Sequence, residues 1–226
     1  MVWDAPLVPL TEYGEAPRFN AGNSRCVLNV VRAARVIQQQ SGLFLLSEHD
    51  FQVMWLAYRL ACACGALSTP PHGTAEALSS EQVLWAGLLH DIGKHVIPEV
   101  ILAKPGPLTA EERQVMQTHS MHGHRMARQL AEEHHIPEID RVVLQGILHH
   151  HERYDGEGYP VGLSGESIPL LARILTVMDV YAALTSPRAY HAALPPQAAL
   201  DYLLEHQGTI FDPVLVRHAV RILQFH

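Results

Sequence analysis

The fold is organised around the stretch from Leu88 to Gly106, which reads LLHDIGKHVIPEVILAKPG. The apolar run VLWAGLL over residues 83–89 leads directly into His90 and Asp91, which predicts a buried helix that ends in two metal-type ligands. A carboxylate against an apolar wall loses its hydration unless a partner supplies positive charge, and a divalent cation would do so. A His-Asp pair alone is more typical of a core histidine beside a capping aspartate, so the interpretation depends on the rest of the chain.

Three further segments carry residues that could join a metal centre. His119 lies on the apolar face of a predicted helix, although a histidine there is usually a satisfied core group. His149, His150 and His151 end another helix, and because adjacent helical side chains point about 100° apart, two of them can reach one centre. Asp179 is embedded in an apolar helix, where a buried carboxylate needs a partner. Together these positions favour a metal centre over separate core histidines.

The hydrophobic periodicity predicts an all-α fold of about eight helices, because no stretch shows sustained strand alternation. Residues that cap helix N-termini mark several starts, namely Ser47 or Glu48, Ser79, and Thr109 with Glu112 in a capping box. The expected helices cover residues 24–40, 48–66, 80–91, 110–130, 139–151, 169–184, 195–205 and 213–224.

The chain has 226 residues, which is the length of one domain with a sizeable core and a short extension. We expect a lead-in and helix over residues 1–40 and the main domain over residues 41–226. The start of the chain lacks the features of a signal peptide, and no apolar run approaches the roughly 18 residues needed to span a bilayer. A soluble, cytoplasmic protein without membrane insertion is therefore expected.

The composition limits the class of partner. The 23 acidic and 16 basic residues give a net charge of −7, which argues against a binder of DNA or RNA polymers, because phosphate tracking needs a basic surface. The 16 histidines, several of them inside short motifs, are the more informative count. Cys26, Cys62 and Cys64 show no disulfide spacing, and we expect buried thiols there rather than a metal site.

The loop over residues 155–160 reads DGEGYP, with a backbone flexible enough to wrap a ligand and an aromatic residue near its end. With this loop, the ordered motifs of the chain resemble those of the HD-GYP phosphodiesterases, a branch of the HD-domain metal-dependent phosphohydrolases. The resemblance runs from about Glu48 to Pro213. Its most specific segments are HDIGK at 90–94, IP at 97–98, KPG at 104–106, HHERYDG at 150–156, GYP at 158–160 and the stretch from Arg173 to Tyr190.

The resemblance implies an HD-domain helical bundle with a metal centre in its core. The implied reaction is hydrolysis of cyclic di-GMP to linear pGpG, with some relatives continuing to GMP. Two divalent ions per chain would place a bridging hydroxide in line with the phosphorus, and mixed imidazole and carboxylate ligands suit iron or manganese. Asp91 would bridge both ions. The implied metal ligands are His49, His90, Asp91, His119, His150, His151 and Asp179.

Other positions match the family's catalytic and supporting groups. Lys94 joins Asp91 as an expected catalytic residue, because its ammonium group could protonate the leaving oxygen. Glu152 is expected to orient a ligating imidazole. The residues expected to contact the substrate are Lys94, Gly158, Tyr159, Arg188 and His191.

Three positions depart from the family pattern. His191 stands where many relatives carry a basic residue, which weakens the expected hold on the second phosphate at neutral pH. Ala182 replaces an acidic residue, which should alter packing around the centre rather than abolish it. Leu45 lies one helical turn before His49, where some relatives use a glutamate to bind a third metal. Leucine cannot coordinate, so we expect two ions and pGpG as the main product.

Two other functions remain open. A catalytically weak cyclic di-GMP receptor is favoured by His191 and disfavoured by the complete ligand set. An HD-domain hydrolase of another nucleotide is disfavoured by the Gly158-Tyr159-Pro160 loop. Besides the nucleotide, the expected partners are a second copy of the chain or a regulatory protein. No sensory domain is visible in the sequence.

Overall fold

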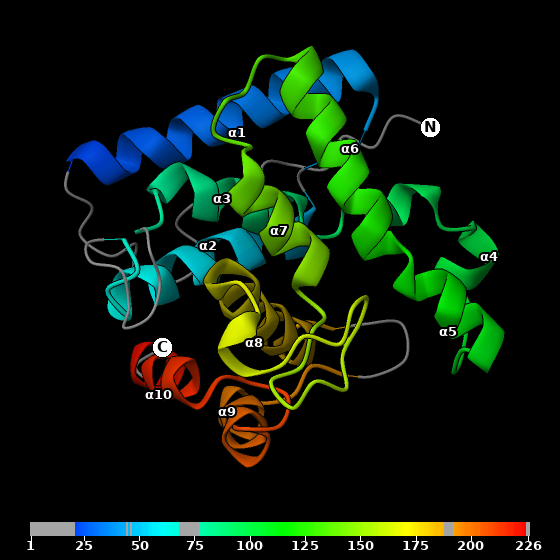
Figure 1. Cartoon of the computed structure of the whole chain (residues 1–226), viewed down its shortest axis with the longest axis vertical. Coiled ribbons are helices and arrows are strands. Elements are labelled where there is room, and N and C mark those ends of the chain that lie inside the picture. The colour runs from blue at the N-terminus through cyan, green and yellow to red at the C-terminus, as the bar shows by residue number, and fades with distance from the viewer. Residues whose placement is uncertain (1–20, 44, 46, 68–76, 188–191, 225–226) are drawn as a thin grey trace.

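The computed structural model describes residues 21–43, 45, 47–67, 77–187 and 192–224 of the chain. Within these ranges the chain forms helices joined by loops, and the predicted all-α fold is confirmed (Figure 1). No helix in these ranges combines the length and the apolar character needed to cross a bilayer. The helices are α1 Ala21–Ser41, α2 Glu48–Ala63, α3 Ser80–Leu89, η2 Ile92–Val96, α4 Glu99–Leu102, α5 Ala110–Gln117, α6 His119–Glu133, α7 Arg141–His149, η3 Gly165–Ser167, α8 Leu170–Thr185, α9 Pro196–Glu205 and α10 Pro213–Leu223.

The core lies between α2, α3, α7 and α8, which pack against one another. Residues 83–89 of α3 are all buried, as the apolar run predicted, and residues 171–178 of α8 are buried as well. Figure 1 shows α1 lying across one side of α3, with α9 and α10 at the opposite end of the molecule beside α8. The two most buried helices therefore carry His90 and Asp179 into the middle of the molecule.

The first helix, expected within the N-terminal segment of lead-in and helix, belongs to this core. Val27, Val30, Ala34 and Ile37 are buried, and α1 packs against α3. These are positions of the apolar stripe that the helical periodicity predicted.

Three predicted helix starts are confirmed by hydrogen bonds at the caps. The Ser47 side chain accepts a hydrogen bond from the Asp50 amide in the first turn of α2. Ser79 and Gln82 form a capping box in front of α3, and Thr109 and Glu112 form another in front of α5. These side chains satisfy amides that the first turn of a helix leaves without partners.

Several predicted boundaries are wrong, and two of them have a clear physical cause. The helix expected over residues 110–130 breaks at Thr118, whose amide donates to the Val115 carbonyl at 3.1 Å, and α6 begins at His119. The helix expected over residues 139–151 begins at Arg141, because the Asp140 carboxylate caps it by accepting hydrogen bonds from two amides of its first turn. Apolar periodicity reveals neither boundary, since apolar residues stand on both sides of each in the sequence, although no residue of α5 is buried.

The expectation of buried thiols is wrong for Cys62, which is exposed, and Cys26 and Cys64 are half-buried. The helical phase explains the difference within α2. Positions two apart point about 200° apart, so α2 cannot bury both Cys62 and Cys64 against the same neighbour.

Candidate metal centre

The side chains predicted as metal ligands converge between α2, α3, α6, α7 and α8. Most of them stand at helix ends, where the backbone can turn a side chain into the space between packed helices. Their positions are His49 in the first turn of α2, His90 and Asp91 after α3, His119 at the start of α6, His150 and His151 after α7, and Asp179 within α8.

These residues form two groups of candidate ligands that share Asp91. The first group, which we call the carboxylate-rich group, contains His49, His90, Asp91 and Asp179, and the second, the histidine-rich group, contains Asp91, His119, His150 and His151. Ligand atoms of His49, His90 and Asp91 lie within 4.8 Å of one another, and so do those of the histidine-rich group. Asp179 joins the first group through its Oδ1 atom, which is 3.0 Å from His49 Nε2 and 3.7 Å from His90 Nε2.

Asp91 lies between the groups and directs one oxygen toward each. Its Oδ1 atom is 3.4 Å from His119 Nε2 and 4.0 Å from His150 Nε2. Its Oδ2 atom is 3.4 Å from His90 Nε2 and 4.0 Å from His49 Nε2. A carboxylate in this position can ligate one cation with each oxygen.

Backbone carbonyls fix the orientation of the central imidazoles. The Nδ1 atoms of His90, His119 and His150 lie 2.8, 2.7 and 2.7 Å from the carbonyl oxygens of Gly87, Met116 and Ile147. A carbonyl only accepts, so each Nδ1 carries a proton, and the neutral form of each imidazole keeps a lone pair on Nε2 that faces the centre. This is the tautomer that a metal ligand requires.

The Nε2 atoms of the histidine-rich group crowd one another. His119 Nε2 is 3.4 Å from His150 Nε2 and 3.1 Å from His151 Nε2. His90 Nε2 and Asp91 Oδ1 are buried and have no hydrogen-bond partner in the described part of the chain. Unpaired buried acceptors are costly, and facing lone pairs repel, whereas a cation between them would satisfy all of these atoms. The cluster could therefore bind metal ions.

Burial and charge separate the proton affinities of these groups. Burial lowers the pKa of His119, His150 and His151, in the last case to about 3. Burial alone would also lower the pKa of His90, but the Asp91 carboxylate raises it well above its usual range. Burial would raise the pKa of Asp91, yet the Lys94 ammonium group holds it well below the ordinary value. The histidine-rich group thus keeps neutral imidazoles, the form that binds metal, over a wide pH range.

The free energy of unfolding of the metal-free chain should fall as the pH drops below 6.5, the ordinary pKa of histidine. Below that value the unfolded chain binds protons at His119, His150 and His151, while the folded chain does so only near the lowered pKa, about 3 for His151. Each such imidazole costs up to about 1.4 kcal/mol per pH unit in this window. His90 does not oppose this slope, because its stabilisation is fully present below 6.5 and is lost only as the pH rises through its raised pKa.

Urea unfolding of the metal-free chain between neutral pH and about pH 5 measures this slope. His151→Gln should give a shallower slope than the parent chain. Equal slopes for the two chains would contradict the assignment of His151 to the acid-sensitive group.

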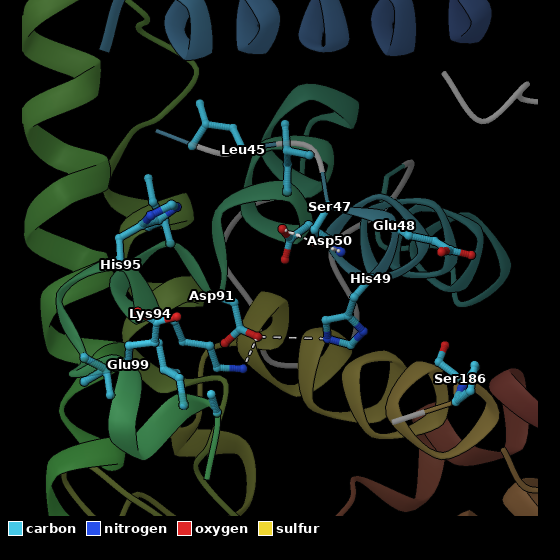
Figure 2. Close-up of a pocket in the computed structure, with 16 residues that line it drawn as sticks. Leu45, Ser47, Glu48, His49, Asp50, Asp91, Lys94, His95, Glu99 and Ser186 are labelled. Carbon is cyan, nitrogen blue, oxygen red and sulfur yellow. Dashed lines mark hydrogen bonds and ion pairs between the residues drawn. The ribbon is translucent and has the colours of Figure 1, made fainter. Parts of the chain in front are cut away.

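A cavity of about 980 Å³ opens onto one side of the cluster. Figure 2 shows Asp91 between His49 and Lys94 in this cavity, and the Lys94 ammonium group forms an ion pair with Asp91. Leu45 and Leu102 contribute apolar wall to the cavity. A substrate in this space would meet the Asp91 carboxylate and the Lys94 ammonium group together.

The Gly-Tyr-Pro loop covers the other group. The Tyr159 ring stacks on the His151 ring, with centroids 4.8 Å apart and planes inclined by 25°. Gly158 packs against the chain itself, because a Cβ atom there would lie 2.3 Å from the Arg153 amide nitrogen. The described residues that line the cavity include none from residues 155–160. Arg188 and His191 lie outside the described residues, although Pro187 lines the cavity.

The expected role of Glu152 is wrong. Its carboxylate accepts hydrogen bonds from amides of residues 161–163 and lies 3.4 Å from His149 Nδ1, a histidine outside both ligand groups. Carbonyls three residues earlier in the chain orient His119 and His150 instead. Glu152 therefore bonds to the loop rather than directly to a ligating imidazole.

Asp50 is a residue of the site that the sequence did not single out. It lines the cavity, and its carboxylate accepts a hydrogen bond from Ser47 Oγ at 2.5 Å. Burial raises its pKa, and the nearby Asp91 carboxylate adds to the rise. Asp50 follows the predicted ligand His49 in the first turn of α2, and this proximity is the signal that could have identified it. Ala182, by contrast, is fully buried in the core.

Comparison with known proteins agrees with this geometry. A family model described as HD domain matches residues 64–215, more than half of the chain, and this range includes every predicted ligand apart from His49. The chain is similar in structure to Bd1817, an HDG"Y"P protein from Bdellovibrio bacteriovorus, with a TM-score of 0.58 and 20% identity, over 89% of this chain and 62% of that one.

Curated relatives match at higher identity but over part of their length. The cyclic di-GMP phosphodiesterase response regulator RpfG of Xanthomonas campestris is 44% identical over 147 residues, which is 64% of this chain and 38% of RpfG. The 3'3'-cGAMP-specific phosphodiesterase 3 of Vibrio cholerae is 37% identical over 140 residues, which is 61% of this chain and 29% of that protein. This chain thus spans less than half of each relative. The family model covers more than half of the chain, and the helical core with Asp91 between two ligand groups agrees with it. The chain therefore belongs to the HD-domain family.

Proposed function

We propose that the chain is a metal-dependent phosphodiesterase that hydrolyses cyclic di-GMP. The observation that carries this proposal is Asp91, whose Oδ1 and Oδ2 atoms lie 3.4 Å from His119 Nε2 and His90 Nε2 respectively. A carboxylate placed between two groups of nitrogen ligands suits a pair of cations, the arrangement that favours in-line displacement at phosphorus. The substrate class is supported by the name of RpfG, to which the chain is similar over part of its length.

Two ions per chain would use the two groups of ligands. The carboxylate-rich group would hold one ion through two imidazoles and two carboxylates, and the histidine-rich group would hold the other through three imidazoles and the shared Asp91. Neither group contains a thiolate, which suits iron or manganese. Leu45 is only 2% exposed and offers no carboxylate for a third ion. Two ions are therefore the proposed content.

The chain's own groups would bind and orient the substrate. The bound cations would supply positive charge to the phosphoryl oxygens and lower the pKa of a water. Lys94 Nζ lines the cavity beside Asp91, from where it would donate a proton to the leaving oxygen. The proposed substrate contacts are Lys94, Gly158, Tyr159, Arg188 and His191, with Arg188 pairing with a phosphate.

Metal removal should abolish turnover. We expect the iron- or manganese-loaded chain, incubated anaerobically with cyclic di-GMP, to form pGpG as the main product resolved by chromatography. The chain stripped by a chelator should form none, because the side chains of the described cluster do not provide the charge of two divalent ions at the phosphorus. Readdition of metal should restore the product.

The outcomes of this assay separate the alternatives. Tight binding of cyclic di-GMP without product would support a receptor instead of an enzyme. Accumulation of GMP would contradict pGpG as the main product. Turnover that survives complete metal removal would exclude the proposed mechanism.

A second candidate substrate is 3'3'-cGAMP, because a relative specific for it matches 61% of the chain. Both nucleotides present the same bridging phosphates, and they differ in one base. A competition assay with equal amounts of the two nucleotides compares their kcat/KM values directly. We expect cyclic di-GMP to be consumed first.

A further inference from the structure

A buried carboxylate lies beneath the segment that follows the Gly-Tyr-Pro loop. Glu152 is 1% exposed and accepts hydrogen bonds from three successive amides. Val161 N lies 2.9 Å from its Oε1 atom, and Gly162 N and Leu163 N lie 3.0 and 3.1 Å from its Oε2 atom. Bonds to an ionised acceptor are roughly twice as strong as bonds between neutral groups. The carboxylate therefore ties residues 161–163 to the end of α7.

The buried His149 side chain supports Glu152 from within α7. Its Nδ1 atom lies 3.4 Å from Glu152 Oε1, and its Nε2 atom lies 3.2 Å from Gln145 Oε1. His149 belongs to neither group of candidate ligands. The first histidine of the consecutive run, His149, thus faces Glu152 instead of the metal cluster.

This support determines where the Tyr159 ring lies. The Tyr159 amide donates to the His151 carbonyl at 3.2 Å, and the Glu152 bonds fix the chain just after Pro160. The Tyr159 ring is held between these two attachments, stacked on His151 and edge-on to His119 with centroids 6.5 Å apart. The loop backbone therefore cannot carry the ring away from His151 unless one attachment breaks.

The loop and the cavity meet different parts of the cluster. The cavity reaches it at His49, Asp91 and Lys94, and its described lining includes no residue of the segment from Glu152 to Leu163. The Tyr159 ring covers His151, on the histidine-rich group. The loop is thus placed to close that group while the cavity admits a substrate beside Asp91.

We propose that Glu152 is a positioning residue: by holding the amides of residues 161–163, it keeps the Tyr159 ring on His151 and so retains the metal ion of the histidine-rich group. This inference rests on the proposed function, because it needs a metal at that group. A stacked ring restricts the His151 imidazole to its ligating orientation and shields it from water. Supporting partners of this kind are typically worth about 10- to 100-fold in metal affinity.

Glu152→Gln is the direct test. Glutamine has the size of glutamate but only one acceptor oxygen, and its NH2 group would face amide donors. Amide hydrogen exchange of residues 161–163 should become faster in the metal-free variant. Calorimetric titration with Mn²⁺ should show one of two sites weakened about 10- to 100-fold. Glu157→Gln makes the same chemical change at an exposed position of the same loop and should alter neither measurement.

Two further variants show which site is affected and keep the test decisive if Glu152→Gln does not fold. Tyr159→Leu removes the ring but leaves the Glu152 bonds, so it should weaken the same site without faster exchange at residues 161–163. In a chain that already carries His119→Ala, the Glu152→Gln change should cause no further loss at the remaining site.

The contrary outcomes are distinct. Unchanged Mn²⁺ affinity in Tyr159→Leu, or in a folded Glu152→Gln with faster exchange, would overturn the inference. Equal effects of Glu152→Gln and Glu157→Gln would also overturn it. A parent chain that binds no Mn²⁺ would overturn the proposed function and the metal-retaining role together, while the exchange comparison would still decide whether Glu152 holds the loop.

Discussion

Asp91→Ala should release both metal ions and lower the turnover of cyclic di-GMP at least about 10³-fold, the scale on which removal of one charge-stabilising group acts. The reason is that no other side chain of the cluster belongs to both groups of candidate ligands. Without Asp91, the histidine-rich group has only neutral imidazoles to hold a divalent ion. The Lys94 ammonium group also loses its carboxylate partner beside the cavity. Elemental analysis of the purified variant gives the metal content, and chromatography gives the turnover.

Two comparison variants make this result specific. Asp179→Ala changes only the carboxylate-rich group and should release one ion, because Asp179 Oδ1 lies near His49 and His90. Asp201→Ala removes an exposed carboxylate that accepts a hydrogen bond from the Gln197 side chain within α9, and this variant should retain both ions. Full metal content in Asp91→Ala would refute the shared role of Asp91.

Much of the candidate site was predictable because its ligands are tied to helix patterning. An apolar run long enough to form a buried helix must leave the residues at its end, His90 and Asp91, at the depth of the core. Asp179 follows the same logic within α8, where its neighbours on both sides are buried or half-buried. A polar residue inside an apolar run therefore carries information about a partner, and the structure brings these residues together.

The role of Glu152 could not be predicted because it depends on hydrogen bonds with amides about ten residues later in the chain, on the far side of the loop. In the sequence, Glu152 directly follows His149, His150 and His151, which predicts that its carboxylate is the partner of a ligating imidazole. The imidazoles of His119 and His150 are instead satisfied locally, by carbonyls three residues earlier. This leaves the carboxylate free for the amides of residues 161–163. Which acceptor a buried histidine uses is set by backbone geometry that composition does not reveal.

The break at Thr118 is a second feature hidden from the pattern. Apolar residues such as Met116 and Met126 stand on both sides of the break in the sequence, so periodicity cannot tell one helix from two, although no residue of α5 is buried. The break makes His119 the first residue of α6, where its Nδ1 atom reaches the Met116 carbonyl. The position of the candidate ligand His119 thus depends on a local irregularity that the pattern of apolar residues does not reveal.

Gly93→Ala should destabilise the chain by at least about 3 kcal/mol, the upper end of the usual cost of overpacking a core. A Cβ atom at this position would lie 1.9 Å from the His119 carbonyl oxygen and 2.4 Å from the Gly123 amide nitrogen, both of which are backbone atoms. Backbone cannot rotate away as a side chain can, so η2 and α6 must separate. Because Asp91 precedes η2 and His119 begins α6, the 3.4 Å distance between Asp91 Oδ1 and His119 Nε2 must change with them. Loss of metal should accompany the loss of stability.

Gly42→Ala is the matched control for this substitution. It adds the same methyl group where no atom lies within 4 Å, and its positive φ of 71° carries only the backbone cost of about 1–2 kcal/mol. Urea unfolding of both metal-free variants compares the two losses, and Mn²⁺ titration compares their metal binding. We expect Gly42→Ala to bind metal as the parent chain does, because Gly42 lies beyond the end of α1 and outside both groups of ligands. Equal stability losses in the two variants, or full metal binding by Gly93→Ala, would show that the close approach of η2 to α6 does not set the spacing between Asp91 and His119.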